Sequence, residues 1–320
     1  MCINGEVHTA EGKRQQRGTT KQASSTMYRA TLVFLALIGV SCTAVPLLPV
    51  DRFELTVHPP LLLESISAVT ADQRGNLYVL HRPATGNPVV MLDAQGHLLR
   101  SWGQGLFKLP HGIRLDPDGN VWTVDAHTSM VYKFTPEGQL LLAINVGEVP
   151  DPSRDFCGAT DVAFAPNGHV FVADGYCNAR VIEYDAGGRK VRAWGKRGSG
   201  PGEFQVVHAI AVGPQGHVYV ADRENGRLQW FDPQGTFLGQ WSYGGQLFTV
   251  AFSPAGDLYV STHPKRVSWD TAFTVLKIDP ASGTRLGRVE VRAHELTIAP
   301  DGTLLPATLS SQLLVLRLRQ

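Results

Sequence analysis

Three histidines occupy one position of a repeating sequence, which makes them candidates for a metal site. His111, His208 and His294 each lie eight residues before the turn glycine of a predicted β-hairpin. Imidazole nitrogens suit zinc, and three of them leave a fourth coordination position for water or substrate. A single histidine in a channel is more often a hydrogen-bonding filler, but three of the 11 histidines at one repeat position predict a catalytic zinc site.

The repeat that carries these histidines predicts the fold. Segments in which apolar residues alternate with small or polar ones recur six times, each with a glycine at its turn. The turn glycines are Gly75, Gly119, Gly168, Gly216, Gly256 and Gly302. Their spacing of 40 to 49 residues is the length of a four-stranded propeller blade. We therefore predict an all-β, six-bladed β-propeller over residues 55–320, in preference to an open β-solenoid.

The predicted propeller brings the three histidines together. Because the innermost strand of each blade lines the central channel, equivalent positions lie at one height around one axis. We call the position eight residues before each turn glycine the channel position. In successive blades it holds Ser67, His111, Thr160, His208, Phe248 and His294. The histidines thus belong to alternate blades and are expected to converge, whereas His81, His127, His169, His217 and His263 are predicted to be loop or surface residues.

Further polar side chains are predicted at the same mouth of the channel, where the second strand of each blade ends. They are Arg82, Asp125, His127, Asp174, Tyr176, Asp222 and Arg223. Two guanidinium groups and a phenol beside a metal ion suit an anionic substrate, since arginine can bind a carboxylate through two parallel hydrogen bonds. For each residue taken singly, a salt bridge at the rim is the alternative, such as Arg223 with Asp222 or Glu224.

The composition excludes several classes of protein. Of the 320 residues, 43% are hydrophobic and 18% are charged, which allows a sizeable core and argues against intrinsic disorder. The 29 Lys and Arg residues and 28 Asp and Glu residues give a net charge of +1, so nucleic acid is not an expected partner. The 33 glycines and 20 prolines suit short strands joined by tight turns and argue against an all-helical fold.

Residues 1–50 are predicted to precede the propeller as an N-terminal extension. A basic start at Arg29 and an apolar run within residues 28–46 are typical of a secretory signal peptide. Pro46 interrupts the run, and the apolar part before Cys42 is too short for a membrane span. A lipid anchor on Cys42 is the alternative and would be the one contact with a membrane. The chain starts at Met1 or at Met27, and export to the periplasm or the medium is expected.

Longer motifs in blades two to four resemble those of a known enzyme family. They are Leu-Pro-His-Gly at residues 109–112, Asp-Gly-Tyr-Cys-Asn-Ala-Arg at residues 174–180 and Ala-Asp-Arg-Glu-Asn-Gly-Arg at residues 221–227. In these segments the sequence resembles the peptidyl-α-hydroxyglycine α-amidating lyases, which are zinc-dependent. The repeats themselves resemble NHL repeats. The resemblance covers the chain after about residue 55 and is weaker in blades five and six.

The resemblance implies roles for particular residues. It makes His111, His208 and His294 the zinc ligands, and it gives Arg82, Tyr176 and Arg223 catalytic or substrate-binding roles. It also implies a disulfide between Cys157 and Cys177, and a structural calcium ion whose ligands would map onto Val69, Ile113 and Glu295. The sequence departs from the family at four positions, where it has Arg292 for Met, Glu295 for Asp, and Tyr219 with Trp230 in place of a second disulfide.

The implied reaction is that of a carbon–nitrogen lyase. A carboxylated N-acyl hemiaminal, such as peptidyl-α-hydroxyglycine, is split into a peptide amide and glyoxylate. Zinc would lower the pKa of the hydroxyl group, Tyr176 would take its proton if its own pKa were lowered, and Arg82 or Arg223 would hold the carboxylate. The expected partner is thus a small carboxylated or peptide substrate, and the protein is expected to be a monomer.

Two other functions fit a propeller of this kind. One is a non-catalytic exported propeller that binds a protein or a glycan on one face, for which histidines in alternate blades would serve no purpose. The other is a calcium-dependent lactonase-type propeller, whose metal is held by Glu, Asn and Asp. This second alternative is disfavoured because Asn and Glu do not recur at the channel position.

Overall fold

The repeats fold into hairpins as predicted, and their glycines show why the turns are tight. In the computed structural model, which describes residues 44–147, 151, 153–268 and 273–319, the six turn glycines have φ between +80° and +85°. Glycine adopts this left-handed conformation without steric cost, whereas other residues are strained there. The two strands that flank each turn glycine are antiparallel neighbours in one sheet.

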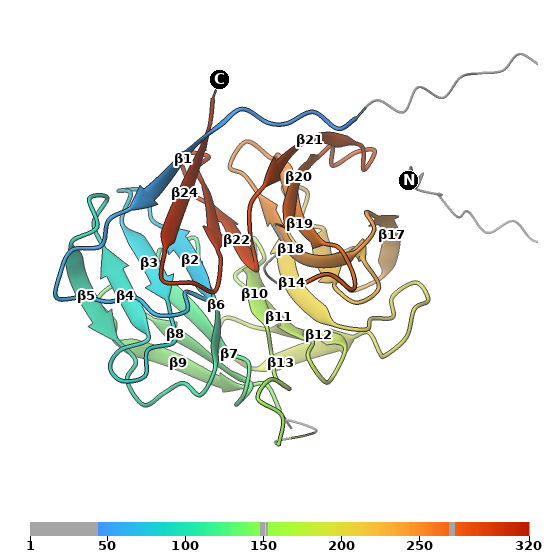
Figure 1. Ribbon diagram of the computed structural model, residues 1–320. Helices are drawn as coiled ribbons and strands as arrows, with labels where there is room; N and C mark the ends of the chain where they lie inside the picture. Colours follow the sequence, from blue (N-terminus) through green and yellow to red (C-terminus); the bar gives the residue numbers. More distant parts are fainter. Residues whose placement is uncertain (1–43, 148–150, 152, 269–272, 320) are drawn as a thin grey trace, which may run out of the picture. The chain divides into compact units, whose positions relative to one another are not determined.

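Six four-stranded sheets form the propeller, each strand hydrogen-bonded to the next in its sheet (Figure 1). The innermost strands are β2 (Ala68–Ala71), β6 (Pro110–Leu115), β10 (Asp161–Phe164), β14 (Val207–Val212), β18 (Gln246–Phe252) and β22 (Glu295–Ile298). The second strands are β3 (Leu77–Leu80), β7 (Val121–Asp125), β11 (Val170–Asp174), β15 (Val218–Asp222), β19 (Leu258–His263) and β23 (Leu304–Ala307).

The two outer strands complete each sheet. The third strands are β4 (Val89–Leu92), β8 (Met130–Phe134), β12 (Arg180–Tyr184), β16 (Arg227–Phe231), β20 (Thr274–Ile278) and β24 (Leu313–Leu318). The outermost strands are β5 (Leu98–Trp102), β9 (Leu140–Asn145), β13 (Lys190–Trp194), β17 (Phe237–Ser242), β21 (Arg285–Glu290) and β1 (Val50–Leu55). Each innermost strand contacts the innermost strand of the next sheet, and β22 contacts β2, so the six strands form a closed ring around the channel.

The sixth sheet contains a strand from the other end of the sequence. Strand β1 pairs antiparallel with β24, from Val50 opposite Leu318 to Leu55 opposite Leu313. The sequence predicts a propeller that begins near residue 55, but in the structure residues 50–55 already belong to it and form the outermost strand of the last sheet. The predicted signal segment and the alternative start at Met27 lie outside the described residues. No helix in the described ranges is long and apolar enough to cross a bilayer.

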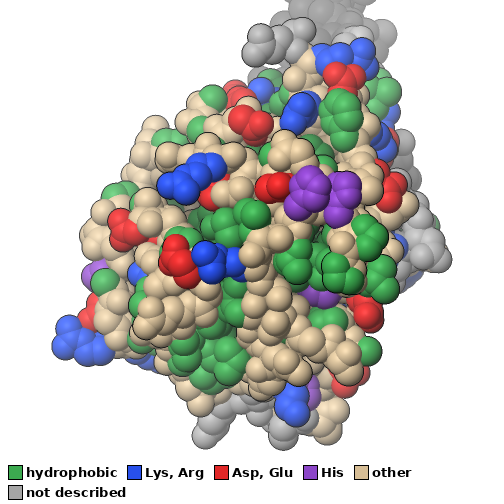
Figure 2. Space-filling view, turned by 90° about the vertical axis from the view of Figure 1, so that its left-hand side faces the viewer, with side chains coloured by type: hydrophobic (Ala, Val, Ile, Leu, Met, Phe, Trp, Pro, Cys, Tyr) green, Lys and Arg blue, Asp and Glu red, His purple; other side chains and the backbone are tan. Residues whose placement is uncertain are grey.

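The apolar core lies between the sheets. Six clusters of buried apolar side chains each join one sheet to the next around the ring. Between the first and second sheets, for example, the Trp102 ring meets Phe134 edge to face with centroids 6.1 Å apart. Tyr219 and Trp230, which replace a disulfide of the resembling family, lie directly opposite each other on β15 and β16 with stacked rings. On the face shown in Figure 2, acidic and basic side chains are interspersed.

Candidate metal centre and channel mouth

The three histidines project from irregular points of the inner strands. The pairing register shifts at His111, between Pro110 and Gly112 of β6, and again at His208 in β14. A β-bulge of this kind leaves one residue out of the ladder and redirects its side chain, and bulges are frequent next to active sites. His294 directly precedes β22, where its backbone nitrogen donates a hydrogen bond to the carbonyl oxygen of Ala307 (2.9 Å).

The imidazoles converge on the channel axis, as the repeat predicts. Their ring centroids lie 5.1 Å apart for His111 and His208, 5.1 Å for His111 and His294, and 4.9 Å for His208 and His294. All three side chains are buried, and so is that of Glu295. Potential ligand atoms of these four residues all lie within 4.8 Å of one another. The cluster therefore has the composition and the geometry of a metal site.

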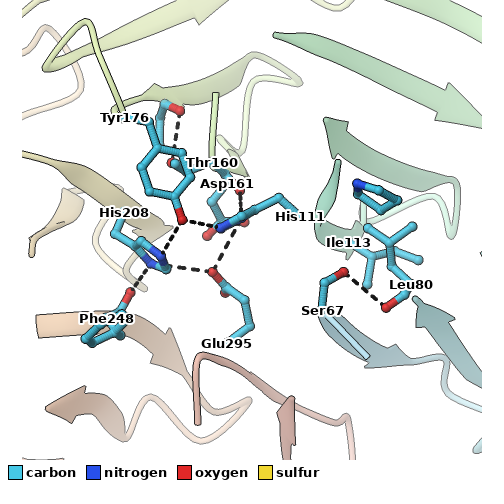
Figure 3. A network of polar contacts seen from close by, with 12 residues as sticks. Ser67, Leu80, His111, Ile113, Thr160, Asp161, Tyr176, His208, Phe248 and Glu295 are labelled. Carbon is cyan, nitrogen blue, oxygen red and sulfur yellow. Dashed lines mark hydrogen bonds and ion pairs between the residues drawn. The ribbon is translucent and has the colours of Figure 1, made fainter. Parts of the chain in front are cut away.

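Neighbouring blades orient two of the rings. The Nδ1 atom of His111 donates to the carbonyl oxygen of Thr160, and that of His208 donates to the carbonyl oxygen of Phe248, each over 2.8 Å (Figure 3). Thr160 and Phe248 occupy the channel position in the next blades. The backbone at two channel positions that lack histidine therefore fixes the orientation of the histidine rings in the preceding blades. Because Nδ1 carries the proton in each ring, Nε2 has a free electron pair with which to bind a metal ion.

The environment keeps these imidazoles neutral. Burial lowers the pKa of His111 to about 3, and the positive charge of Arg82 contributes to the shift. Burial also lowers the pKa of His208 and of His294 well below the usual value, with each further lowered by a neighbouring imidazole. The neutral, unprotonated ring is the form that binds metal ions.

Glu295 places a carboxylate against the same cluster (Figure 3). Its Oε2 accepts a hydrogen bond from Arg114 (3.1 Å), while Oε1 lies 3.9 Å from Nδ1 of His111 and 3.7 Å from Nδ1 of His208. Within the described residues, no donor forms a hydrogen bond with this buried Oε1 atom. A buried carboxylate oxygen without a hydrogen bond is costly, so a positive charge held by the imidazoles would stabilise it.

Tyr176 lies over the histidines at the channel mouth (Figure 3). Its hydroxyl oxygen lies 2.8 Å from Nε2 of His111 and 3.3 Å from Nε2 of His208. Burial raises the pKa of this phenol, and the positive charges of Arg223 and Arg82 act in the opposite direction. The phenolic oxygen thus contacts the two Nε2 atoms whose electron pairs would bind a metal ion.

The loop that carries Tyr176 is fixed by a disulfide and a glycine. Cys157 and Cys177 form the predicted disulfide, and the backbone nitrogen of Tyr176 donates to the carbonyl oxygen of Gly158 (3.3 Å). Gly175 packs so closely against the backbone of Val207 that a Cβ atom there would overlap it. A disulfide persists in oxidising compartments, which agrees with the predicted export.

Removing this disulfide is expected to cost stability. In a Cys157→Ala/Cys177→Ala double variant, the closed loop with its sequence separation of 20 residues opens, and the free energy of unfolding should fall by about 3 kcal/mol. Urea unfolding of the variant and of the wild type measures the difference. A Tyr132→Phe variant, which keeps the disulfide, serves as the control for loss of a single hydrogen bond. Two thiols that react with an alkylating reagent in unfolded, unreduced wild-type protein would contradict the assignment.

The two predicted arginines lie at the same mouth but differ in their partners. Arg223 Nε donates to Glu224 (2.9 Å), and its guanidinium carbon lies 5.3 Å from the ring centres of both Tyr176 and Phe248. Arg82 is close enough to lower the pKa of His111 and of Tyr176. Within the described residues, hydrogen bonds from its side chain are limited to Nε donating to the carbonyl oxygen of Pro110 (3.0 Å). Its two terminal amino groups are therefore available to a ligand.

The acidic residues predicted at the mouth have a different role. Asp125 accepts hydrogen bonds from the backbone nitrogens of Lys108, Leu109 and Thr128, so it holds the loops at the end of its strand. Asp174 pairs with Arg180, and Asp222 pairs with Arg227 rather than with Arg223. All three carboxylates are buried and serve the structure of the blades.

Two histidines predicted to lie in loops or on the surface are instead buried. The exposed fraction of both His81 and His263 is 2%. Nδ1 of His81 accepts a hydrogen bond from the backbone nitrogen of Glu64, and its Nε2 donates to the carbonyl oxygen of Asn87. His81 directly follows β3 and His263 is the last residue of β19, and the hydropathy pattern does not show whether the end of a strand is covered by a loop.

The residues that the resemblance suggests for calcium do not fit that ion in this chain. The guanidinium of Arg114 donates to the carbonyl oxygen of Ile113 (3.1 Å) and to Glu295 (3.1 Å), and so occupies two of the three suggested ligands. Val69 is a buried residue of β2. Arg114 was not singled out from the sequence. The sequence does contain a pattern that could have indicated it. Arg114 is a charged residue on a predicted inner strand, three positions after His111.

Comparisons with known proteins agree with this architecture. A model of the NHL repeat family matches residues 156–184 and 204–231. The structure is similar to that of a streptogramin B lyase, with a TM-score of 0.61 at 12% sequence identity, over 84% of this chain and 98% of that one. At this level of identity, the likeness concerns the fold alone.

Two other proteins are similar to this chain in sequence at 30% identity or more. The chain is 32% identical over 302 residues to the probable peptidyl-alpha-hydroxyglycine alpha-amidating lyase of Caenorhabditis elegans, covering 82% of this chain and 85% of the relative. It is 34% identical over 235 residues to peptidyl-glycine alpha-amidating monooxygenase B of Xenopus laevis, covering 62% of this chain and 27% of the relative. This chain thus spans about a quarter of the length of that longer protein.

Proposed function

Because the chain belongs to the family of peptidyl-α-hydroxyglycine α-amidating lyases, we propose that it is a zinc-dependent carbon–nitrogen lyase. The proposed substrate is a carboxylated N-acyl hemiaminal such as peptidyl-α-hydroxyglycine, and the proposed products are a peptide amide and glyoxylate. One observation supports this proposal above the others: the hydroxyl group of Tyr176 lies within hydrogen-bonding distance of the Nε2 atoms of both His111 and His208, the atoms proposed to bind the metal ion.

The residues present suit zinc. His111, His208 and His294 would hold the ion, since three neutral imidazoles are a common ligand set for catalytic zinc. The carboxylate of Glu295, whose Oε1 atom has no hydrogen bond from the described residues, would balance part of its charge. When bound, zinc supplies a Lewis acid that lowers the pKa of an oxygen in contact with it.

Tyr176 is the proposed general base. Its phenolate form would take the proton of the substrate hydroxyl, so that the O–H bond breaks and its electron pair forms the new carbonyl bond. The carbon–nitrogen bond breaks as the carbonyl bond forms, its electron pair goes to the departing amide nitrogen, and the phenol gives that nitrogen the proton. Burial raises the pKa of this phenol, and the charge of Arg223, which lies over the Tyr176 ring, acts in the opposite direction and so favours the phenolate.

Arg82 is the proposed binding residue for the substrate carboxylate. Within the described residues, Arg82 forms no ion pair and donates only to a neutral carbonyl oxygen, whereas the charge of Arg223 is paired with Glu224. A guanidinium fork would hold the carboxylate through two charge-assisted hydrogen bonds and fix the hydroxyl group beside Tyr176.

Replacement of Arg82 by glutamine is expected to weaken substrate binding. The loss of charge-assisted hydrogen bonds, worth about 1.5–3 kcal/mol, should lower kcat/KM roughly 10- to 150-fold, mainly through KM. Glyoxylate release from an N-acyl-α-hydroxyglycine measures this effect. With the methyl ester of the same compound, the variant and the wild type should react at similar rates, and equal losses on both substrates would refute the role of Arg82 in carboxylate binding.

Metal analysis followed by a rate assay tests the function as a whole. Purified protein should contain about one zinc ion per chain and release glyoxylate from an N-acyl-α-hydroxyglycine, as expected for a three-histidine site. The same compound without its hydroxyl group is the control substrate. Zinc-loaded protein that releases no glyoxylate would overturn the proposed reaction, and a binding propeller or a different hemiaminal would then become the better hypothesis.

A further inference from the structure

One arginine side chain joins three blades in the channel next to the metal centre. Arg114 lies on β6, three residues after His111, and its side chain is 14% exposed. It donates to Asp161 of the third blade (2.9 Å) and to Glu295 of the sixth (3.1 Å). It also donates to Thr297 of the sixth blade (3.0 Å). The side chains of Asp161 and Glu295 are almost fully buried, so both carboxylates depend on a cation inside the channel.

We propose that the Arg114 guanidinium takes the place of a channel calcium ion in this chain, so that the stability of the propeller does not depend on calcium. The guanidinium bonds to a backbone carbonyl and to two acidic side chains, which are groups that calcium would bind. Arg114 is part of the polypeptide and cannot be lost to a chelator or to a medium poor in calcium.

Few oxygen ligands remain for a calcium ion beside Arg114, because of the four carboxylate oxygens of Asp161 and Glu295 only Asp161 Oδ1 and Glu295 Oε1 have no hydrogen bond from the described residues. Calcium takes six to eight oxygen ligands at about 2.3–2.6 Å. Glu295 Oε2 and the Ile113 carbonyl oxygen already accept N–H groups of Arg114, and Asp161 Oδ2 accepts both Arg114 and the backbone nitrogen of Ile210. A divalent ion that bound the same oxygens would also be repelled by the guanidinium charge.

This inference goes beyond the proposed lyase function and does not depend on it. Its subject is how the blades are held together at the axis, and its readouts are thermal stability and calcium content. A failure of the proposed reaction would leave these readouts unchanged.

Calcium titration of the wild type and of an Arg114→Ala variant tests the proposal. Wild-type protein dialysed against calcium-free buffer should contain no stoichiometric calcium, and its Tm should not change when calcium chloride is added. The variant leaves two buried carboxylates without a cation and should lose on the order of 10 °C in Tm. Added calcium, but not added sodium at equal ionic strength, should restore roughly half of that loss, because the ion binds only the folded state.

Three further variants make the outcome decisive. Arg114→Lys keeps a positive charge and should remain more stable than Arg114→Ala, with no response to calcium. Asp161→Asn combined with Arg114→Ala removes one calcium ligand and should abolish the rescue. Arg189→Ala removes a guanidinium that is 88% exposed and should change neither the Tm nor the response to calcium.

Several results would overturn the proposal. Stoichiometric calcium in the wild type, or a rise in its Tm on addition of calcium, would show that the ion and Arg114 coexist. An Arg114→Ala variant that calcium does not stabilise would reduce Arg114 to an ordinary ion-pair partner. If that variant does not fold at all, the Arg114→Lys variant and the calcium content of the wild type still decide the question.

Discussion

His208→Ala is expected to purify with most of its zinc missing and to release glyoxylate at least about a thousandfold more slowly than the wild type, because the metal contributes several kcal/mol to transition-state stabilisation. His208 is fully buried, and its Nδ1 is fixed by the carbonyl oxygen of Phe248, so its Nε2 atom has one defined direction. Metal analysis and the rate assay on the same sample measure both effects.

Two comparisons separate loss of the metal from loss of the fold. His208→Gln retains most of the side-chain volume and should also lose zinc, with an unchanged circular dichroism spectrum. His169→Ala removes a histidine that pairs with Glu183 on the blade and should keep both zinc and activity. Full zinc retention in His208→Ala would eliminate His208 as a ligand.

Tyr176→Phe is expected to lower kcat by on the order of 10²–10⁴ with little change in KM, which is the usual size of a general-base contribution. The phenylalanine ring keeps the contacts with Phe156 and Arg223 but lacks the oxygen that lies between His111 and His208. The variant should also keep its zinc, because Tyr176 is not a proposed ligand.

Another tyrosine, which lies in the apolar core, provides the control for this variant. Tyr132 donates its hydroxyl hydrogen to the carbonyl oxygen of Leu106 (3.0 Å), in the core between the first two sheets. Tyr132→Phe should therefore cost some stability and leave kcat unchanged. If Tyr176→Phe releases glyoxylate at the wild-type rate, Tyr176 takes no part in the proton transfer.

The sequence predicts the blades well because each blade is a local unit. A turn glycine such as Gly75 must take a positive φ, and alternating residues on both sides of it must face opposite sides of a sheet. Strand β1 could not be predicted in this way. Its residues, from Val50 to Leu55, pair with a strand at the far end of the sequence, and no turn connects the two.

In the candidate site, too, the features that depend on the repeat could be predicted, and those that depend on individual side-chain conformations could not. The recurrence of histidine at the channel position predicts convergence, because the symmetry of the ring converts an equal register into spatial proximity. The contact of Glu295 with two imidazoles and the path of Arg114 depend on side-chain conformations, which spacing does not encode. The roles of Asp125 and Asp174 became clear only from their hydrogen bonds, since a strand-end carboxylate looks the same in sequence whether it binds a ligand or a loop.

The pairing of β1 with β24 sets the order in which the protein can fold. The first five sheets are each built from four consecutive strands, so each of them can form as soon as its own segment is available. The sixth must wait for both ends of the propeller, as illustrated by the hydrogen bond between Gln312 and Glu54, which lie 258 residues apart. Closing a loop of this length in an unfolded chain costs about 5 kcal/mol in entropy, so closure is favourable only when the other blades have already brought the ends together. Until then, β24 has an unpaired edge that could join another chain, which makes ring closure the step at which folding and aggregation compete.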